Sequence, residues 1–144
     1  MESQNFSNHR RWVPAYHFLL SLLLLAGIVI SIINVVRHWS HPPGLLSCLL
    51  IAFMFICMSF VYWYMRQFPI KAQDRAIRAE EALRYYILSG KPLSNKLSIG
   101  QIIALRFASD EEFLSLTDRA IAEGLSQDDI KKAIANWRAD HHRV

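Results

Sequence analysis

The chain has 144 residues, 53% of them hydrophobic, and a formal net charge of +4 at pH 7. Two stretches without Asp, Glu, Lys or Arg together hold 53 of these residues, and the chain after them, residues 66–144, has room for one small domain at most. The charge does not indicate a nucleic-acid-binding tail, because residues 66–144 mix 13 Lys and Arg with 11 Asp and Glu.

The two uncharged stretches, residues 12–36 and 38–65, predict a transmembrane hairpin. Each supplies the roughly 20 apolar residues that a helix needs to cross about 30 Å of hydrocarbon. We therefore expect spans at about 16–36 and 45–65, with a reversal at the prolines and glycine of 42–44. The first run is too long for a signal peptide and a second span follows at once, so it is expected to stay in the mature protein.

Basic residues near the span ends predict the orientation. Arg10 and Arg11 precede the first span, Arg66 and Lys71 follow the second, and only Arg37 lies between the spans. Because cytoplasmic flanks carry the excess of Lys and Arg, both termini are expected in the cytoplasm. Aromatic residues agree with this, since Tyr16 and Tyr62 would then lie at the same inner interface.

Small and polar residues form a stripe on each span, which is how transmembrane helices pack closely. The packing candidates are Gly27, Ser31 and Asn34 on the first span and Cys48, Ala52 and Ser59 on the second. Packing within the hairpin is favoured over assembly with another membrane protein.

Cys48 and Cys57 share one helix nine residues apart and point to different faces, so they cannot form a disulfide within one chain. Neither span has an ionisable residue deep inside, so no transport pathway is predicted.

Residues 67–90 are expected to form the juxtamembrane segment, with a helix from about Ile70 to Ser89 after a kink or an end near Pro69. An apolar stripe with helical spacing follows Ala72, Ala76, Ala79, Leu83, Tyr86 and Ile87. On the polar side, Glu80 and Arg84 have the spacing of a favourable (i, i+4) pair. The stripe needs a partner helix, either from the chain's own tail or from another protein.

Three capping boxes predict three further helices, and thus an all-α chain without strands. The boxes are Ser98 with Gln101, Ser109 with Glu112, and Ser126 with Asp129. The apolar faces are Ile99, Ile102, Ile103 and Phe107, then Phe113, Leu116, Ala120 and Ile121, then Ile130, Ala133, Ile134 and Trp137. The expected domains are the N-terminal segment and hairpin at 1–66, the juxtamembrane helix at 67–90 and a cytoplasmic three-helix domain at 91–144. A domain this small is marginally stable alone and is expected to dock on something.

No nucleophile motif and no glycine-rich phosphate loop is present, so the sequence predicts neither an enzyme nor a cofactor or small-molecule site. Asp140, His141 and His142 have the side chains of metal ligands, but they are neighbours near the C-terminus. They indicate an exposed polar end rather than a metal site.

One segment of the tail has the spacing of a helix-turn-helix, through Ala120, Gly124 and Ile130. A recognition helix there would begin with the carboxylates of Asp128 and Asp129, where phosphates would lie. Only Lys131 and Lys132 oppose them. The pattern therefore disfavours nucleic acid as a partner.

Several runs carry a resemblance to a known family. They are Asn8-His9-Arg10 with Pro14 and His17, KAQDRAIRAEE at 71–81, LRFASDEE at 105–112, IKKAI at 130–134 and NWRADHHRV at 136–144. Over nearly its whole length the chain resembles a bacterial domain-of-unknown-function family of small two-span inner-membrane proteins. The resemblance implies a multi-pass protein of the bacterial inner membrane and brings no activity with it. It also implies a partner surface or a self-association surface at Lys71, Asp74, Arg75, Arg78, Glu81, Trp137, Arg138, His141 and His142.

Two functions are compatible with these features. The first, which we favour, is a non-enzymatic accessory or scaffold subunit of an inner-membrane complex, in contact with lipid and with another membrane protein or further copies of itself. The alternative is a membrane-tethered sensor or regulator whose helical tail binds DNA or a cytoplasmic partner.

Overall fold

A computed structural model describes residues 5–6, 12–40 and 42–140 of the chain. The helices are η1 (Ala15–Leu20, a π-helix), α1 (Ser21–His38), α2 (Pro42–Ser89), α3 (Ile99–Leu105), α4 (Asp110–Glu123) and α5 (Gln127–Ala133). Within this described part there is no strand, only an isolated bridge between Ala108 and Trp137. The all-helical prediction is confirmed. The chain divides into a unit of Trp12–Phe68 and a second unit that contains residues 69–140, and α2 contributes to both.

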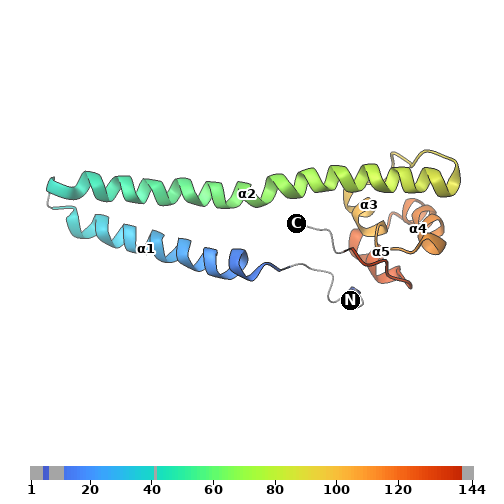
Figure 1. The fold of residues 1–144 in the computed structure, drawn as a ribbon, viewed down its shortest axis with the longest axis horizontal. Coiled ribbons are helices and arrows are strands. Elements are labelled where there is room, and N and C mark those ends of the chain that lie inside the picture. The colour runs from blue at the N-terminus through green and yellow to red at the C-terminus, as the bar shows by residue number, and fades with distance from the viewer. Residues whose placement is uncertain (1–4, 7–11, 41, 141–144) are drawn as a thin grey trace. The chain divides into compact units, whose positions relative to one another are not determined.

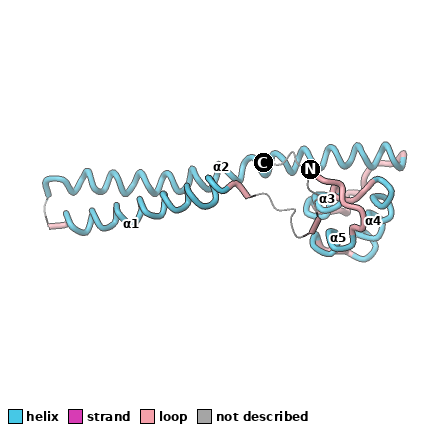
Figure 2. Tube along the Cα trace, turned by 60° about the horizontal axis from the view of Figure 1, so that its bottom comes forward, coloured by secondary structure: helices cyan, strands magenta, loops and turns pink. Residues whose placement is uncertain are grey.

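The first unit is a pair of antiparallel helices. In both Figure 1 and Figure 2, η1 and α1 run beside residues 42–68 of α2. The chain reverses at Pro43, with ψ of 101°, and at Gly44, with φ of +117°, a backbone angle that favours glycine. The helices Ala15–His38 and Pro43–Ser89 are each long and apolar enough, by length and composition, to cross a membrane.

Pro69 lies inside α2 and does not end it. Pro43 and Gly44 are the residues with non-helical backbone angles in α2, whereas Pro69 is not among them. A proline removes one backbone donor, but its fixed φ is itself helical, so a long helix can continue through it at the cost of one hydrogen bond. Of the kink or end expected near Pro69, the end is therefore wrong.

The second unit has its core between α3, α4 and α5. The predicted caps at Ser98 and Ser126 are present: the Ser98 side chain accepts from the Gln101 N–H at 3.3 Å, and the Ser126 side chain accepts from the Asp129 N–H at 3.2 Å. At Ser109 the reciprocal half of the capping box is present, in which the Ser109 N–H donates to the Glu112 carboxylate at 3.4 Å. The buried core residues are Leu97, Ile102, Ala104, Leu105, Phe107, Ala108, Phe113, Leu116, Ala120, Ile130 and Ile134. Ile99, expected in the core, is 41% exposed because it is the first residue of α3, at the rim of the domain.

Candidate interaction surfaces

The inside of the helical pair contains the small and polar residues that the sequence predicted for packing. Gly27, Ser31, Asn34, Cys48, Ala52 and Ser59 are all buried or half-buried. The ring of Phe55 lies so close to Gly27 that a Cβ atom there would overlap it. The hydroxyls of Ser31 and Ser59 donate to backbone carbonyls of their own helices, each at 2.8 Å. The two hydroxyls of this stripe are thus satisfied without water.

A hydrogen-bonded cluster joins the two helices near the start of η1. The Tyr16 hydroxyl donates to the Tyr62 carbonyl oxygen at 2.6 Å, and the two rings are stacked with centroids 4.7 Å apart. Ser21 Oγ lies 2.6 Å from the Tyr62 hydroxyl and donates to the His17 carbonyl at 2.9 Å. Tyr16 and Tyr62 therefore lie at one level, as their expected common interface requires, although the sequence did not mark Ser21.

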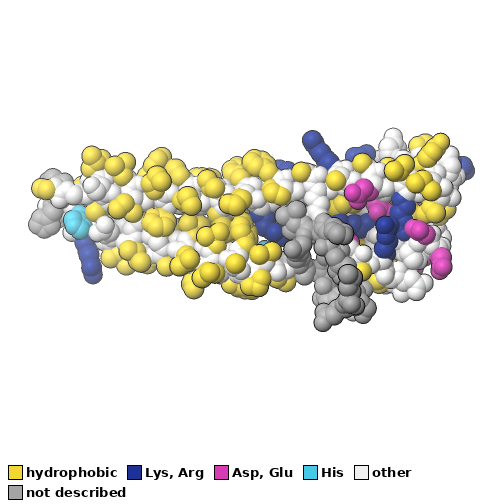
Figure 3. Space-filling view, in the orientation of Figure 1, with side chains coloured by type: hydrophobic (Ala, Val, Ile, Leu, Met, Phe, Trp, Pro, Cys, Tyr) yellow, Lys and Arg dark blue, Asp and Glu magenta, His cyan; other side chains and the backbone are white. Residues whose placement is uncertain are grey.

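The outer surface of this unit is apolar. Figure 3 shows hydrophobic side chains covering α1 and the first part of α2. Leu22, Ile30 and Phe60 are 64%, 66% and 61% exposed, and many other large apolar residues of Trp12–Phe68 are similarly open. An exposed apolar surface of this extent indicates contact with something other than water.

In the second unit, Arg84 fastens α2 to the helical domain. Its guanidinium lies 3.1 Å from a Glu81 carboxylate oxygen and 2.6 Å from Asp110 Oδ1. It also donates to the Ala108 carbonyl at 2.7 Å and lies over the Phe113 ring, 4.2 Å from its centroid. Arg84 thus pairs with Glu81 and Asp110 rather than with Glu80, because the tail domain covers that side of α2.

Glu81 lies on this covered face and is only 6% exposed. Burial raises the pKa of its carboxyl above the ordinary value, and the neighbouring Arg84 opposes the rise in pKa. Lys71, Arg75 and Arg78 are exposed and Asp74 is half-buried. The implied partner surface at 71–81 is thus open at its three basic residues, whereas Glu81 belongs to the interior.

The segment after α5 packs against the loop before α4. The Arg138 N–H donates to the Phe107 carbonyl at 2.7 Å, and the Ser109 N–H donates to the Asn136 carbonyl at 3.1 Å. The half-buried Trp137 ring lies 5.1 Å from the Phe107 ring. Of the implied C-terminal partner surface, Trp137 therefore packs on the core and Arg138 is exposed. His141 and His142 lie outside the described residues.

Glu112 and Asp140 have structural partners that the sequence did not predict. The two carboxylate oxygens of Glu112 accept from the backbone N–H groups of Ala135 and Asn136, each at 3.0 Å, in addition to the Ser109 N–H at 3.4 Å. Asp140 forms an ion pair with the buried Arg106 at 3.1 Å. Acidic residues that look like helix-start or terminal charge thus hold the C-terminal segment in place.

The predicted apolar stripe of the juxtamembrane segment is open to solvent. Its residues, Ala72, Ala76, Ala79, Leu83, Tyr86 and Ile87, are all exposed. The tail domain packs instead on the opposite face of α2, where Ile77 and Glu81 are buried. Of the two partners considered for the stripe, the chain's own tail is therefore wrong.

The helix-turn-helix spacing corresponds to α4 and a very short α5 of seven residues. Lys131, which would have to reach phosphates, is only 8% exposed, whereas Asp128 and Asp129 are exposed. Ser126 lowers the pKa of Asp129 through hydrogen bonds, so this carboxylate stays charged. The exposed N-terminal turn of α5 is therefore acidic.

Comparison with known proteins places the chain in a family. The model of a family of unknown function, DUF6526, matches residues 1–144. The chain belongs to this family. The resemblance inferred from the sequence runs is thereby confirmed, and the DUF6526 match adds no activity to it. No curated protein and no solved structure matches the chain.

Proposed function

We propose that this DUF6526 protein is a non-enzymatic accessory or scaffold subunit of a complex in the bacterial inner membrane. The unit Trp12–Phe68 would lie in the lipid as a two-span hairpin, and residues 69–144 would lie in the cytoplasm with the N-terminus. The observation that carries the proposal is the inverted arrangement of the first unit. Its large apolar side chains face outward, whereas Ser21, Ser31 and Ser59 are hydrogen-bonded within.

Two further features support the orientation and the role. Arg10, Arg11, Arg66 and Lys71 flank the same proposed side of the hairpin, as the distribution of basic residues at cytoplasmic flanks requires. The open stripe from Ala72 to Ile87 gives the cytoplasmic part an apolar surface that its own domain does not cover. An anchor with a free docking surface is what a scaffold needs.

The orientation is tested by labelling single cysteines in intact cells with a membrane-impermeant thiol reagent. Ser40→Cys, in the exposed turn between the helices, should be labelled from outside. Asn95→Cys, in the exposed loop before α3, should be labelled only after lysis. Both variants carry Cys48→Ala and Cys57→Ala. The reverse pattern, or recovery of the chain in the soluble fraction, would refute the membrane arrangement.

The role is tested by extracting N-terminally tagged chain from native membranes in mild detergent and measuring the mass and composition of what is recovered. A stoichiometric second protein would support an accessory subunit, and an assembly of identical chains would support a scaffold. A single chain that binds nothing would contradict both.

A further inference from the structure

The open stripe of residues 69–89 has the period of a coiled-coil seam. Ala72, Ala76, Ala79, Leu83 and Tyr86 are separated by four, three, four and three residues, the alternation of a and d positions in a heptad. Leu83 and Tyr86 are 60% and 57% exposed. The face that binds the chain's own domain lies on the other side of the helix, so the seam stays free when the domain is docked.

The charged residues beside the seam are complementary between two parallel copies of the chain. In a parallel pair of helices, a g residue of one chain faces the e residue five positions further along the other. Arg75 occupies a g position and Glu80 the e position five residues later. Both are exposed, and among the described residues neither forms an ion pair within its own chain. Two copies in register would therefore form two symmetric Arg75–Glu80 pairs.

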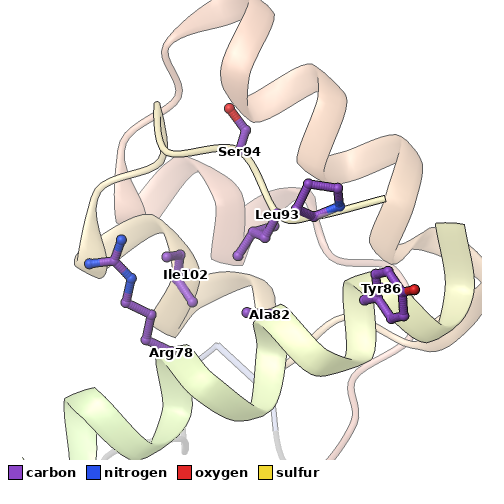
Figure 4. Close-up of a pocket in the computed structure, with 7 residues that line it drawn as sticks. Arg78, Ala82, Tyr86, Leu93, Ser94 and Ile102 are labelled. Carbon is purple, nitrogen blue, oxygen red and sulfur yellow. The ribbon is translucent and has the colours of Figure 1, made fainter. Parts of the chain in front are cut away.

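The next pair of g and e positions along the seam is apolar instead of charged. Ala82 is at g and Ile87, 71% exposed, is at e. Ala82 lines a cavity of about 320 Å³ between α2 and the loop before α3, shown in Figure 4 with Arg78 and Tyr86 on the helix side and Leu93 opposite. A second copy would bring its own Ile87 to this small residue and its cavity.

We propose that residues 69–89 pair in parallel and in register with the same segment of a second copy of this chain. The inference rests on the proposed function for the direction of pairing, because hairpins inserted alike present residue 69 at the same membrane surface. A seam of about two heptads is marginal for free helices. Confinement in one membrane raises the effective concentration of the two copies and makes so short a seam sufficient.

Disulfide formation in native membranes tests the register, in chains that carry Cys48→Ala and Cys57→Ala. Ala79→Cys, at d, should form a cross-linked dimer on mild oxidation. Arg78→Cys, at the adjacent and also exposed position, is the matched control and should form much less of the cross-linked dimer. Equal cross-linking at both positions, or none at position 79, would overturn the proposal.

Charge exchange tests the Arg75–Glu80 pairs without relying on cysteine. Arg75→Glu alone and Glu80→Arg alone each bring like charges together, and the dimer fraction should fall about fivefold. The double variant restores both pairs and should recover it. Two chains with different tags, one with Arg75→Glu and the other with Glu80→Arg, should prefer each other to themselves. If the double variant is no better than the single ones, these pairs do not form.

Fractionation of the same samples tests the seam and the membrane arrangement separately. Chains found in the membrane fraction without position-specific cross-links would refute the seam alone. Chains that cross-link at position 79 from the soluble fraction would keep the seam and refute the membrane arrangement.

Discussion

The two units of the chain place their apolar side chains in opposite ways. In Trp12–Phe68 the large apolar residues lie outside, as Phe60 does with 61% of its surface exposed, and Ser31 is buried at 4%. In the helical domain after α2 the rings of Phe107 and Phe113 lie inside, each only 1% exposed. Both units are helical. The difference agrees with the proposed placement of the first unit in lipid and of the second in water.

One part of the second unit breaks this contrast. Leu83, Tyr86 and Ile87 are exposed in the manner of the hairpin's outer residues, although they belong to the unit that buries Phe107 and Phe113. An apolar patch within a polar surface is typical of a protein–protein contact. The outer surface of the first unit, proposed to face lipid, thus differs from the proposed seam, which is apolar along one stripe.

The largest predicted effect comes from comparing the same phenylalanine-to-alanine substitution in each of the two units. Phe113→Ala removes a fully buried ring and the surface on which Arg84 lies, so it should lower the free energy of unfolding of the second unit by about 3–5 kcal/mol. Phe60→Ala, at a 61% exposed position, should leave the helical pair folded. Hydrogen exchange of the full chain in micelles, followed by mass spectrometry, reports each unit separately.

Equal protection losses in the two variants would contradict the inverted arrangement. So would a loss confined to the first unit, because Phe60 would then be a core residue there. Phe53→Ala, at a second exposed aromatic position of α2, serves as a repeat of the control.

A smaller effect is expected where a carboxylate fastens the C-terminal segment. Glu112→Ala removes the acceptor of the Ala135 and Asn136 N–H groups, and should destabilise the second unit by about 2 kcal/mol. Glu111→Ala changes the adjacent, exposed carboxylate and is the matched control. Hydrogen exchange at residues 135–136 should rise in the first variant and stay unchanged in the second. A rise in both variants would assign the effect to helix-start charge instead.

The helices of this protein could be predicted from local patterns, because a capping serine, a reversal at Gly44 and an uncharged run each act within a few residues. The position of the tail domain could not. The stripe at Leu83 and the face at Glu81 both have helical spacing, and hydrophobicity alone favours the stripe as the buried face. The domain covers the other face because Arg84 finds Asp110 and the Ala108 carbonyl there, a contact across 24 residues or more.

The candidate site residues could likewise be predicted only in part from the sequence. Gly27 and Ser31 could be placed inside the hairpin, because small residues on a span have one common use. The roles of Glu112 and Asp140 could not be found, since their partners are backbone groups and an arginine that only the folded chain brings near.

The smallest predicted effect concerns pH and the buried carboxyl of Glu81. Burial raises its pKa in the folded state, so folded chains bind this proton more readily than unfolded ones. The stability of the second unit should therefore fall as pH rises from the ordinary carboxyl pKa of 4.5 through the raised value. Glu81→Gln cannot titrate, and the wild type should gain stability relative to it as pH is lowered through this window.

Asp129 supplies a control of opposite sign in the same unit. The Ser126 hydrogen bonds lower its pKa in the folded state, so the stability it contributes is present above 3.8 and is lost as pH falls through the lowered value. Relative to Asp129→Asn, the wild type should therefore lose stability in acid. Urea midpoints of the three chains, measured on the second unit across the acidic range, give both slopes. If the two differences had the same sign, the burial of Glu81 would not be what sets its protonation.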